Sequence, residues 1–330
     1  MPPLNPFTER GRITDPARFT GRWSELALIF ERLEAGRPVL LAGPPGIGKS
    51  SLLTHIVQSA AVNLELPDLH AYYLNLAGAE SAADVYRVVV AALRQRGDTL
   101  AALELALVAV EAPVLLCLDD AQTAIAAGWG EGLLESLARI ARAGNLILVA
   151  AVNGRAPLLS ERFATISLGA LAATEVRLLA DTYLDGTGIS FTPAELRDLT
   201  DLSAAHPAYV QRAAFHLFQS KLDPNFDWRA AYLAEARARP VPGAPLPPAI
   251  FEGERNRRME QSSYGEPQGI STPGAPQQFQ LPEVTPALVF TLPLLAAALL
   301  LVLTSNLPLA LLVALGGLLA VGFWLRRAAE

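Results

Sequence analysis

The chain has 330 residues, with 26 basic and 32 acidic side chains and a formal net charge of −6. This balance argues against the strongly basic surface that marks most nucleic-acid-binding proteins. The single cysteine, Cys117, excludes a disulfide within these residues and favours a reducing compartment, and the first ten residues lack the apolar stretch of a secretory signal peptide.

Residues 1–24 are irregular and contain several prolines, glycines and arginines. Apolar side chains then recur at helical spacing, which predicts a helix over 24–35 with Ser24 as its N-cap. We treat 1–24 as a separate N-terminal segment and 25–170 as the next domain.

Within 25–170, short apolar runs alternate with amphipathic segments. Apolar runs in which apolar and polar residues do not strictly alternate are typical of parallel strands that helices cover on both faces. The order therefore predicts an α/β fold with an open parallel sheet, whose ligand lies at the carboxyl ends of the strands. The predicted strands are 39–42, 71–76, 114–118, 146–152 and 164–168, and the predicted helices are 49–62, 82–96, 98–110 and 130–143.

The turn after the first strand fits the phosphate-loop pattern G-x-x-x-x-G-K-[ST]. Glycines let backbone N–H groups turn inward around a phosphate, and the following helix adds its positive N-terminal end. Lys49 is one of only two lysines in the chain, and it would reach the β- and γ-phosphates of ATP while Ser50 ligates Mg²⁺. The predicted nucleotide-binding residues are Gly43, Pro44, Pro45, Gly46, Ile47, Gly48, Lys49, Ser50 and Ser51.

Two carboxylates follow the apolar run at 114–118. They would lie beside the phosphate loop if the two strands are neighbours. Asp119 would then hold Mg²⁺ through water, and Asp120 would orient or deprotonate the attacking water. The alternative is an aspartate pair that caps the following segment.

Three further residues are candidates for contact with the γ-phosphate or a neighbouring nucleotide. Asn153 is the first choice at the end of the strand 146–152 and Arg155 the second, although Asn-Gly is also ordinary turn chemistry. Arg162 is a candidate arginine finger toward another subunit, or a surface arginine.

The signals of strands stop after residue 170, and 171–239 is predicted to be a small all-helical lid. Its helices are expected at 173–184, 193–203, 207–220 and 227–238, with Pro207 at a first helical position.

Residues 240–286 contain ten prolines and five glycines and are predicted to be a disordered linker. Apolar runs of 18 and 19 residues follow at 287–304 and 307–325, each long enough to cross a bilayer. We expect a transmembrane hairpin over 287–325 and a tail at 326–330. Arg326 and Arg327 favour a cytoplasmic tail and hence a cytoplasmic N-terminal domain.

Together these residues resemble the STAND and origin-recognition-like branch of the AAA+ P-loop ATPases, as found in bacteria. The resemblance covers about residues 5–235. It is carried by Asn5-Pro6-Phe7, the Phe19-Thr20-Gly21-Arg22 box, Gly43 to Ser50, Leu115 to Asp120, Leu146 to Asn153 and His206-Pro207.

The resemblance implies that Arg22 helps to form the nucleotide pocket and that Pro207 packs near adenine. Relatives are switches in which ATP favours an assembled state and hydrolysis resets it. The chain departs from them in having no room for long sensor repeats, and Asp120 stands where many AAA+ members have glutamate.

We therefore expect a membrane-anchored, Mg²⁺-dependent ATPase switch that controls self-association or the binding of a protein partner. One alternative is an ATP-binding scaffold with little turnover. A DNA-binding initiator-like ATPase is disfavoured by the charge and the apolar runs, and a small-molecule kinase by the paired aspartates.

Overall fold

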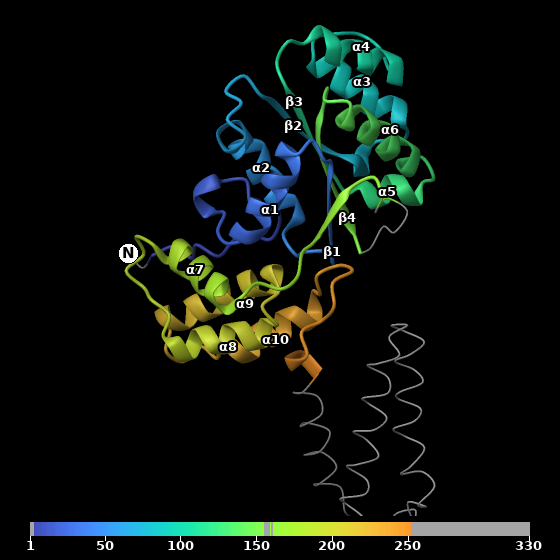
Figure 1. Ribbon diagram of the computed structural model, residues 1–330. Helices are drawn as coiled ribbons and strands as arrows, with labels where there is room; N and C mark the ends of the chain where they lie inside the picture. Colours follow the sequence, from blue (N-terminus) through green and yellow to red (C-terminus); the bar gives the residue numbers. More distant parts are fainter. Residues whose placement is uncertain (1–2, 155–158, 160, 252–330) are drawn as a thin grey trace, which may run out of the picture. The chain divides into compact units, whose positions relative to one another are not determined.

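Figure 1 shows the computed structural model, which describes residues 3–154, 159 and 161–251. At its centre lie five parallel strands in the order β2-β3-β4-β1-β5. Parallel neighbours need crossover connections, and helices supply most of them. The strands are β1 (Val39–Gly43), β2 (His70–Asn75), β3 (Val114–Asp119), β4 (Ile147–Asn153) and β5 (Ala164–Ser167).

The three inner strands of the sheet, β3, β4 and β1, are buried on both faces. Successive side chains of a strand point to opposite faces, so Leu40 and Leu116 join one apolar cluster while Leu41 and Leu115 join the other. Helices α3 to α6 cover the first face, and α1 and α2 cover the second (Figure 1). These helices are α1 (Trp23–Glu34), α2 (Lys49–Asn63), α3 (Ala82–Ala92), α4 (Leu100–Ala109), α5 (Ala121–Ala126) and α6 (Gly130–Arg142).

Four helices follow the sheet and pack around a separate apolar cluster, which we call the helical unit. The N-terminal segment contributes to it, because the fully buried Phe7 ring stacks on Tyr183 at 5.3 Å and on Phe191 at 5.9 Å. The segment also reaches α2, where Ile13 N donates to Ser51 Oγ at 3.0 Å. The helices are α7 (Ala173–Leu184), α8 (Pro193–Ser203), α9 (Pro207–Leu222) and α10 (Trp228–Ala238).

The predicted strands and most helices lie within one or two residues of the observed ones. The prediction of Ser24 as N-cap is wrong, because Arg22 holds the cap position with a left-handed backbone and Ser24 lies inside α1. The predicted helix 82–96 ends early, since Arg94 also adopts a positive φ of 60°. Helix α5 was not predicted.

The packed part of the chain continues beyond the expected start of the linker at residue 240. Val241 is 8% exposed and Ile250 is 2% exposed, and both belong to the core of the helical unit. The rest of the expected linker, the hairpin at 287–325 and the tail lie outside the described residues. Among the residues that the structure describes, no helix combines the length and the apolar character needed to cross a membrane.

Candidate functional site

The phosphate loop lies between β1 and α2, at the carboxyl end of the sheet. Gly46 and Gly48 have φ values of +74° and +99°, which glycine adopts without steric cost. The first hydrogen bond of helical type in α2 runs from Leu52 N to Gly48 O, at 2.9 Å. The backbone N–H groups of residues 49–51 therefore have no acceptor within the helix. A turn of glycines and free amides at a helix N-terminus fits a phosphate group.

Lys49 is held against the same loop. Its side chain is buried, and Nζ donates to Gly43 O and to Pro44 O, each at 2.9 Å. Burial lowers the pKa of Lys49, while the charges of Asp119 and Asp120 oppose that shift. The ammonium group is therefore bonded to the loop, and the charges of both carboxylates act on it.

Asp119 and Asp120 were expected beside the phosphate loop if their strand were a neighbour of β1. The two strands are not neighbours, because β4 lies between β1 and β3. The carboxyl ends of all three strands nevertheless meet at one edge of the sheet. Gly43 pairs with Asn153, and Leu118 pairs with Ala150. This register brings Asn153 to the loop and the two acids to the next position along the edge.

Asp119 is 1% exposed, and both of its carboxylate oxygens accept hydrogen bonds. Oδ1 accepts from Asp120 N at 2.9 Å, and Oδ2 accepts from the Tyr73 hydroxyl at 2.6 Å. Burial and the neighbouring Asp119 raise the pKa of Tyr73 to about 12, which keeps its hydroxyl proton available. The guanidinium of Arg12 stacks 4.2 Å from the Tyr73 ring centroid.

Asp120 is oriented by two side-chain amides that no sequence motif indicates. Asn75 Nδ2 donates to Asp120 Oδ2 at 2.8 Å, and Gln122 Nε2 donates to Oδ1 at 2.9 Å. Gln122 Oε1 also accepts from Asn153 N at 3.2 Å, which connects the ends of β3 and β4. The one sequence signal for Asn75 is its place at the end of a predicted strand.

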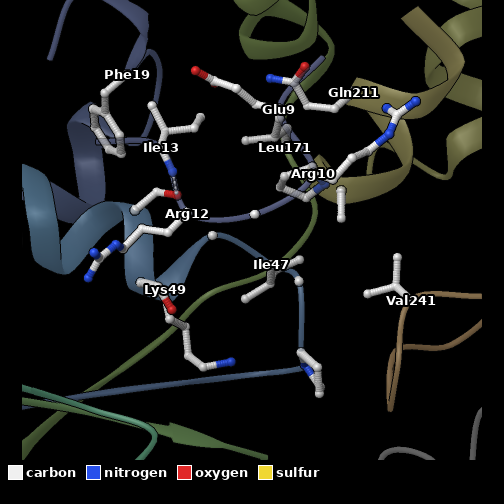
Figure 2. Close-up of a pocket in the computed structure, with 18 of the residues that line it drawn as sticks. Glu9, Arg10, Arg12, Ile13, Phe19, Ile47, Lys49, Leu171, Gln211 and Val241 are labelled. Carbon is white, nitrogen blue, oxygen red and sulfur yellow. Dashed lines mark hydrogen bonds between the residues drawn. The ribbon is translucent and has the colours of Figure 1, made fainter. Parts of the chain in front are cut away.

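A cavity of about 330 Å³ opens above the loop, a size suited to a small-molecule ligand (Figure 2). It runs from the phosphate loop to the helical unit and has both polar and apolar walls. Its lining includes Arg10, Arg12, Ile13, Phe19, Arg22, Pro45, Gly46, Ile47, Gly48, Lys49, Ser50, Ser51, Asp120, Asn153, Leu171, Leu179, Pro207, Ala208, Gln211, Arg212, Val241 and Pro242.

Two of the predicted site residues differ in how they meet this cavity. Arg22 borders it, but its guanidinium donates to Gly169 O at 2.6 Å, to Ile47 O at 3.2 Å and to Glu25. Its role in the described structure is thus to join the phosphate loop to the chain after β5. Arg162 is exposed and is not part of the lining. Arg155 lies outside the described residues.

The helical unit contacts the phosphate loop directly. His206, just before α9, places Nε2 3.1 Å from Pro45 O, so this nitrogen carries the proton. A Cβ atom on Gly46 would lie 2.8 Å from Val241 Cγ1 and 2.9 Å from His206 Cε1. The loop is therefore packed against both the start of α9 and the segment after α10.

Residues 32–153 match the family model described as AAA domain. The match runs from the end of α1 to the end of β4 and includes the phosphate loop and both aspartates. No curated protein matches the chain.

Solved structures match the chain at low sequence identity, and only a TM-score above 0.5 is taken as a likeness of fold. A Walker-type ATPase of Pyrococcus abyssi is 12% identical, with 78% of this chain and 81% of that chain covered and a TM-score of 0.52. The Orc1 protein of Aeropyrum pernix, solved in complex with DNA, is 17% identical over 74% and 68% of the two chains, with a TM-score of 0.47. The RuvB Holliday junction branch migration motor of Thermotoga maritima is 18% identical over 78% and 82%, with a TM-score of 0.43.

Residues 32–153 are thus similar to an AAA domain, and they contain four of the five parallel strands of the sheet. ATP and Mg²⁺ are the ligands that AAA+ P-loop ATPases generally use, and the glycine cradle and the lysine described above suit a triphosphate. Asp120 lines the cavity, whereas Asp119 lies behind it.

Proposed function

We propose that the chain binds ATP·Mg²⁺ in the cavity above the phosphate loop and hydrolyses it as a molecular switch. The observation that carries this proposal is the meeting of Lys49, Asp119, Asp120 and Asn153 at one edge of the sheet, under a helical unit that contacts the loop. Charge stabilisation and positioning are the main requirements of phosphoryl transfer, and this set of side chains provides both.

Each side chain has a distinct role in the proposal. The amides after Gly48 and the Lys49 ammonium bind the phosphates, and the Ser50 hydroxyl and Asp119 hold Mg²⁺, Asp119 through water. Bound Mg²⁺ would neutralise charge on the β- and γ-phosphates. Asp120 orients the attacking water, and Asn153 contacts the γ-phosphate, with Arg155 as the other candidate for that contact.

The switch is proposed to act through the helical unit. Pro45 and Gly46 belong to the phosphate loop, yet they pack on His206 and Val241 of the helical unit. A change in the loop between nucleotide states would alter these contacts and so favour one position of the unit. The outcome we propose is nucleotide-dependent self-association or partner binding, with Arg162 available at the surface as an arginine finger.

The place of action is proposed to be the cytoplasmic face of a bacterial cell membrane. The support is in the sequence alone, from the apolar runs at 287–304 and 307–325 and the following Arg326 and Arg327. The full chain should sediment with membranes and resist extraction by carbonate, whereas a chain that ends at 286 should not. Equal sedimentation of the two would remove the anchor from the proposal.

A second candidate function is an ATP-binding scaffold with little turnover. It is favoured by the hydrogen bonds of Asp120, since Asn75 and Gln122 occupy both carboxylate oxygens that a catalytic base would use. Both functions need the same pocket, and only the rate of hydrolysis separates them.

Phosphate release tests the proposal. The full chain in detergent should release phosphate from ATP in a Mg²⁺-dependent reaction, and Asp120→Asn should bind ATP with similar affinity but release phosphate at least tenfold more slowly. ATP should also change the sedimentation profile of the wild-type chain. Equal, background-level release by the two proteins would favour the scaffold, and no binding of ATP by either would refute both.

A further inference from the structure

One side-chain amide connects two candidate residues at the phosphate loop. Gln122, in the first turn of α5, donates from Nε2 to Asp120 Oδ1 at 2.9 Å and accepts through Oε1 from Asn153 N at 3.2 Å. Asp120 and Asn153 both line the cavity, whereas Gln122 does not. An effect of Gln122 on a bound nucleotide would therefore pass through these two residues and not through direct contact.

The two hydrogen bonds of Gln122 require opposite chemistry. An ionised carboxylate only accepts hydrogen bonds, and a backbone N–H only donates one. The side chain that joins Asp120 to Asn153 N must therefore carry a donor and an acceptor at its end, as a glutamine amide does. Because both ends of the amide have partners, its orientation is fixed.

The connection continues from Gln122 to the phosphate loop. Asn153 pairs with Gly43 in the register of β4 and β1, and Gly154 N donates to Gly43 O at 3.1 Å. Lys49 Nζ donates to the same carbonyl oxygen at 2.9 Å. Gln122 thus joins the carboxylate of Asp120 to the strand end that is bonded to the loop.

Asn75 holds Asp120 in a different way. Its amide donates to the other carboxylate oxygen, and its own Oδ1 accepts from Ala77 N in the turn after β2. This bond connects Asp120 to β2, the edge strand on the side of the sheet away from β1. Of these two amides, Gln122 is the one that connects Asp120 to the strand beside the phosphate loop.

We propose that Gln122 is a positioning residue for ATP hydrolysis, which holds Asp120 and Asn153 at the separation where the attacking water meets the γ-phosphate. In this step the water oxygen bonds to the γ-phosphorus, Asp120 accepts one proton of the water, and the bond from the γ-phosphorus to the β–γ bridging oxygen breaks, so that ADP leaves with that oxygen. The inference rests on the proposed ATPase function, and it adds a residue that acts on hydrolysis and not on nucleotide binding.

The test measures two quantities for the full chain in detergent with Mg²⁺: the affinity for ATP and the rate of phosphate release at saturating ATP. Gln122→Met keeps the length of the side chain and removes both the donor and the acceptor. Gln122→Glu keeps the shape and the acceptor, but it replaces the donor to Asp120 with a second negative charge. Gln58→Met and Gln58→Glu are matched controls, because the Gln58 amide also donates one hydrogen bond, to Thr14 O at 2.8 Å, and lies outside the cavity lining.

Phosphate release at saturating ATP should fall about tenfold or more in both Gln122 variants, because small displacements of positioned groups have large effects on rate. The affinity of Gln122→Met for ATP should change less than about threefold, since the residue does not touch the nucleotide. The two Gln58 variants should match wild type in both quantities.

A wild-type rate in Gln122→Glu would show that only the shape of the side chain matters, and it would overturn the inference. A wild-type rate in Gln122→Met would also overturn it, as would a loss of ATP affinity in Gln122→Met as large as the loss of rate. A wild-type chain that binds ATP without releasing phosphate, or binds none, would instead refute the proposed ATPase function.

Discussion

Asp120 illustrates how single residues set the chemistry of this site. Its backbone lies in the left-handed region, with φ +53° and ψ +35°, at the junction of β3 and α5. This conformation costs a non-glycine residue about 1–2 kcal/mol, and the surrounding bonds hold it in place. The strained turn aims the carboxylate at Asn75 and Gln122 instead of letting it cap α5.

The hydrogen bond from Asn75 leads to a first prediction. In Asn75→Ala, Asp120 Oδ2 loses its partner and becomes free to accept from water, so phosphate release should rise by roughly three- to tenfold if Asp120 acts as a base. Steady-state phosphate release measures this effect, and Asn63→Ala, at the exposed end of α2, provides the control. A fall in the rate would mean that Asn75 supports catalysis by holding Asp120 in position.

His206 predicts how stability depends on pH. Burial lowers the pKa of this histidine below its ordinary value near 6.5, with Lys49 and Arg22 acting in the same direction and the Pro45 carbonyl opposing them. When the pH falls below about 6.5, His206 of the unfolded chain takes up a proton more readily than His206 of the folded chain. The free energy of unfolding therefore decreases as the pH falls. Between pH 7.5 and 5.5 the melting temperature of His206→Asn should therefore fall less than that of wild type.

Replacement of the exposed His70 by asparagine is the control for the substitution itself. The buried-histidine effect should be reduced and not abolished in His206→Asn, because burial also lowers the pKa of His55. Identical slopes for wild type and His206→Asn would contradict the role assigned to this contact.

The sequence motif predicts the position of Lys49 and of the two aspartates because local spacing determines their place at strand ends. It does not reveal Asn75 or Gln122, since their contacts to Asp120 depend on which strands are neighbours and on a left-handed turn.

At the scale of elements, the phosphate loop and the helical unit share a tight contact at Gly46. Gly46→Ala would add a Cβ atom against the stiff Val241 side chain and the His206 ring, which its bond to Pro45 holds in place. Gly48→Ala meets no atom within 4 Å and suffers only from its positive φ. Urea unfolding without nucleotide should show a loss of about 1 kcal/mol for Gly48→Ala and about 1–3 kcal/mol more for Gly46→Ala.

Equal losses in the two glycine variants would show that the helical unit does not press on the loop in solution. The measurement is made without nucleotide because both residues belong to the proposed phosphate-binding loop, where ligand binding would add its own contribution to stability.

The elements of the sheet could be predicted because long apolar runs and their helices follow simple periods. The order of the strands could not be predicted. The position of β4 between β1 and β3 depends on tertiary packing and has no signal in the local sequence. Helix α5 escaped prediction because it has only six residues and begins without a side-chain cap.

At the scale of the molecule, the segment after α10 belongs to the folded part of the chain. Tyr209 Oη accepts from Val241 N at 3.1 Å, and Arg237 donates to Ile250 O at 2.8 Å. Proline and glycine content predicted a linker here, but it could not show that the few apolar residues fit into the core of the helical unit.

Two adjacent residues test this packing in the full chain. Ile250 is 2% exposed, so Ile250→Ala should lower the free energy of unfolding of the folded part by about 2–4 kcal/mol. Phe251 is 55% exposed, and Phe251→Ala should change it by less than about 0.5 kcal/mol. Similar small effects for both variants, measured by urea unfolding, would indicate that the linker begins near residue 240 after all.

The central claim is that one cavity over the phosphate loop binds ATP·Mg²⁺, and calorimetric titration of the full chain tests it most directly. The two lysines of the chain provide a matched pair, because Lys49 donates within the loop and Lys221 donates to Glu195 on the helical unit. Wild type and Lys221→Ala should bind ATP·Mg²⁺ with similar affinity, and Lys49→Ala should bind it about 100-fold more weakly, as expected for loss of charge-assisted hydrogen bonds to phosphate. Unchanged affinity in Lys49→Ala would contradict the account.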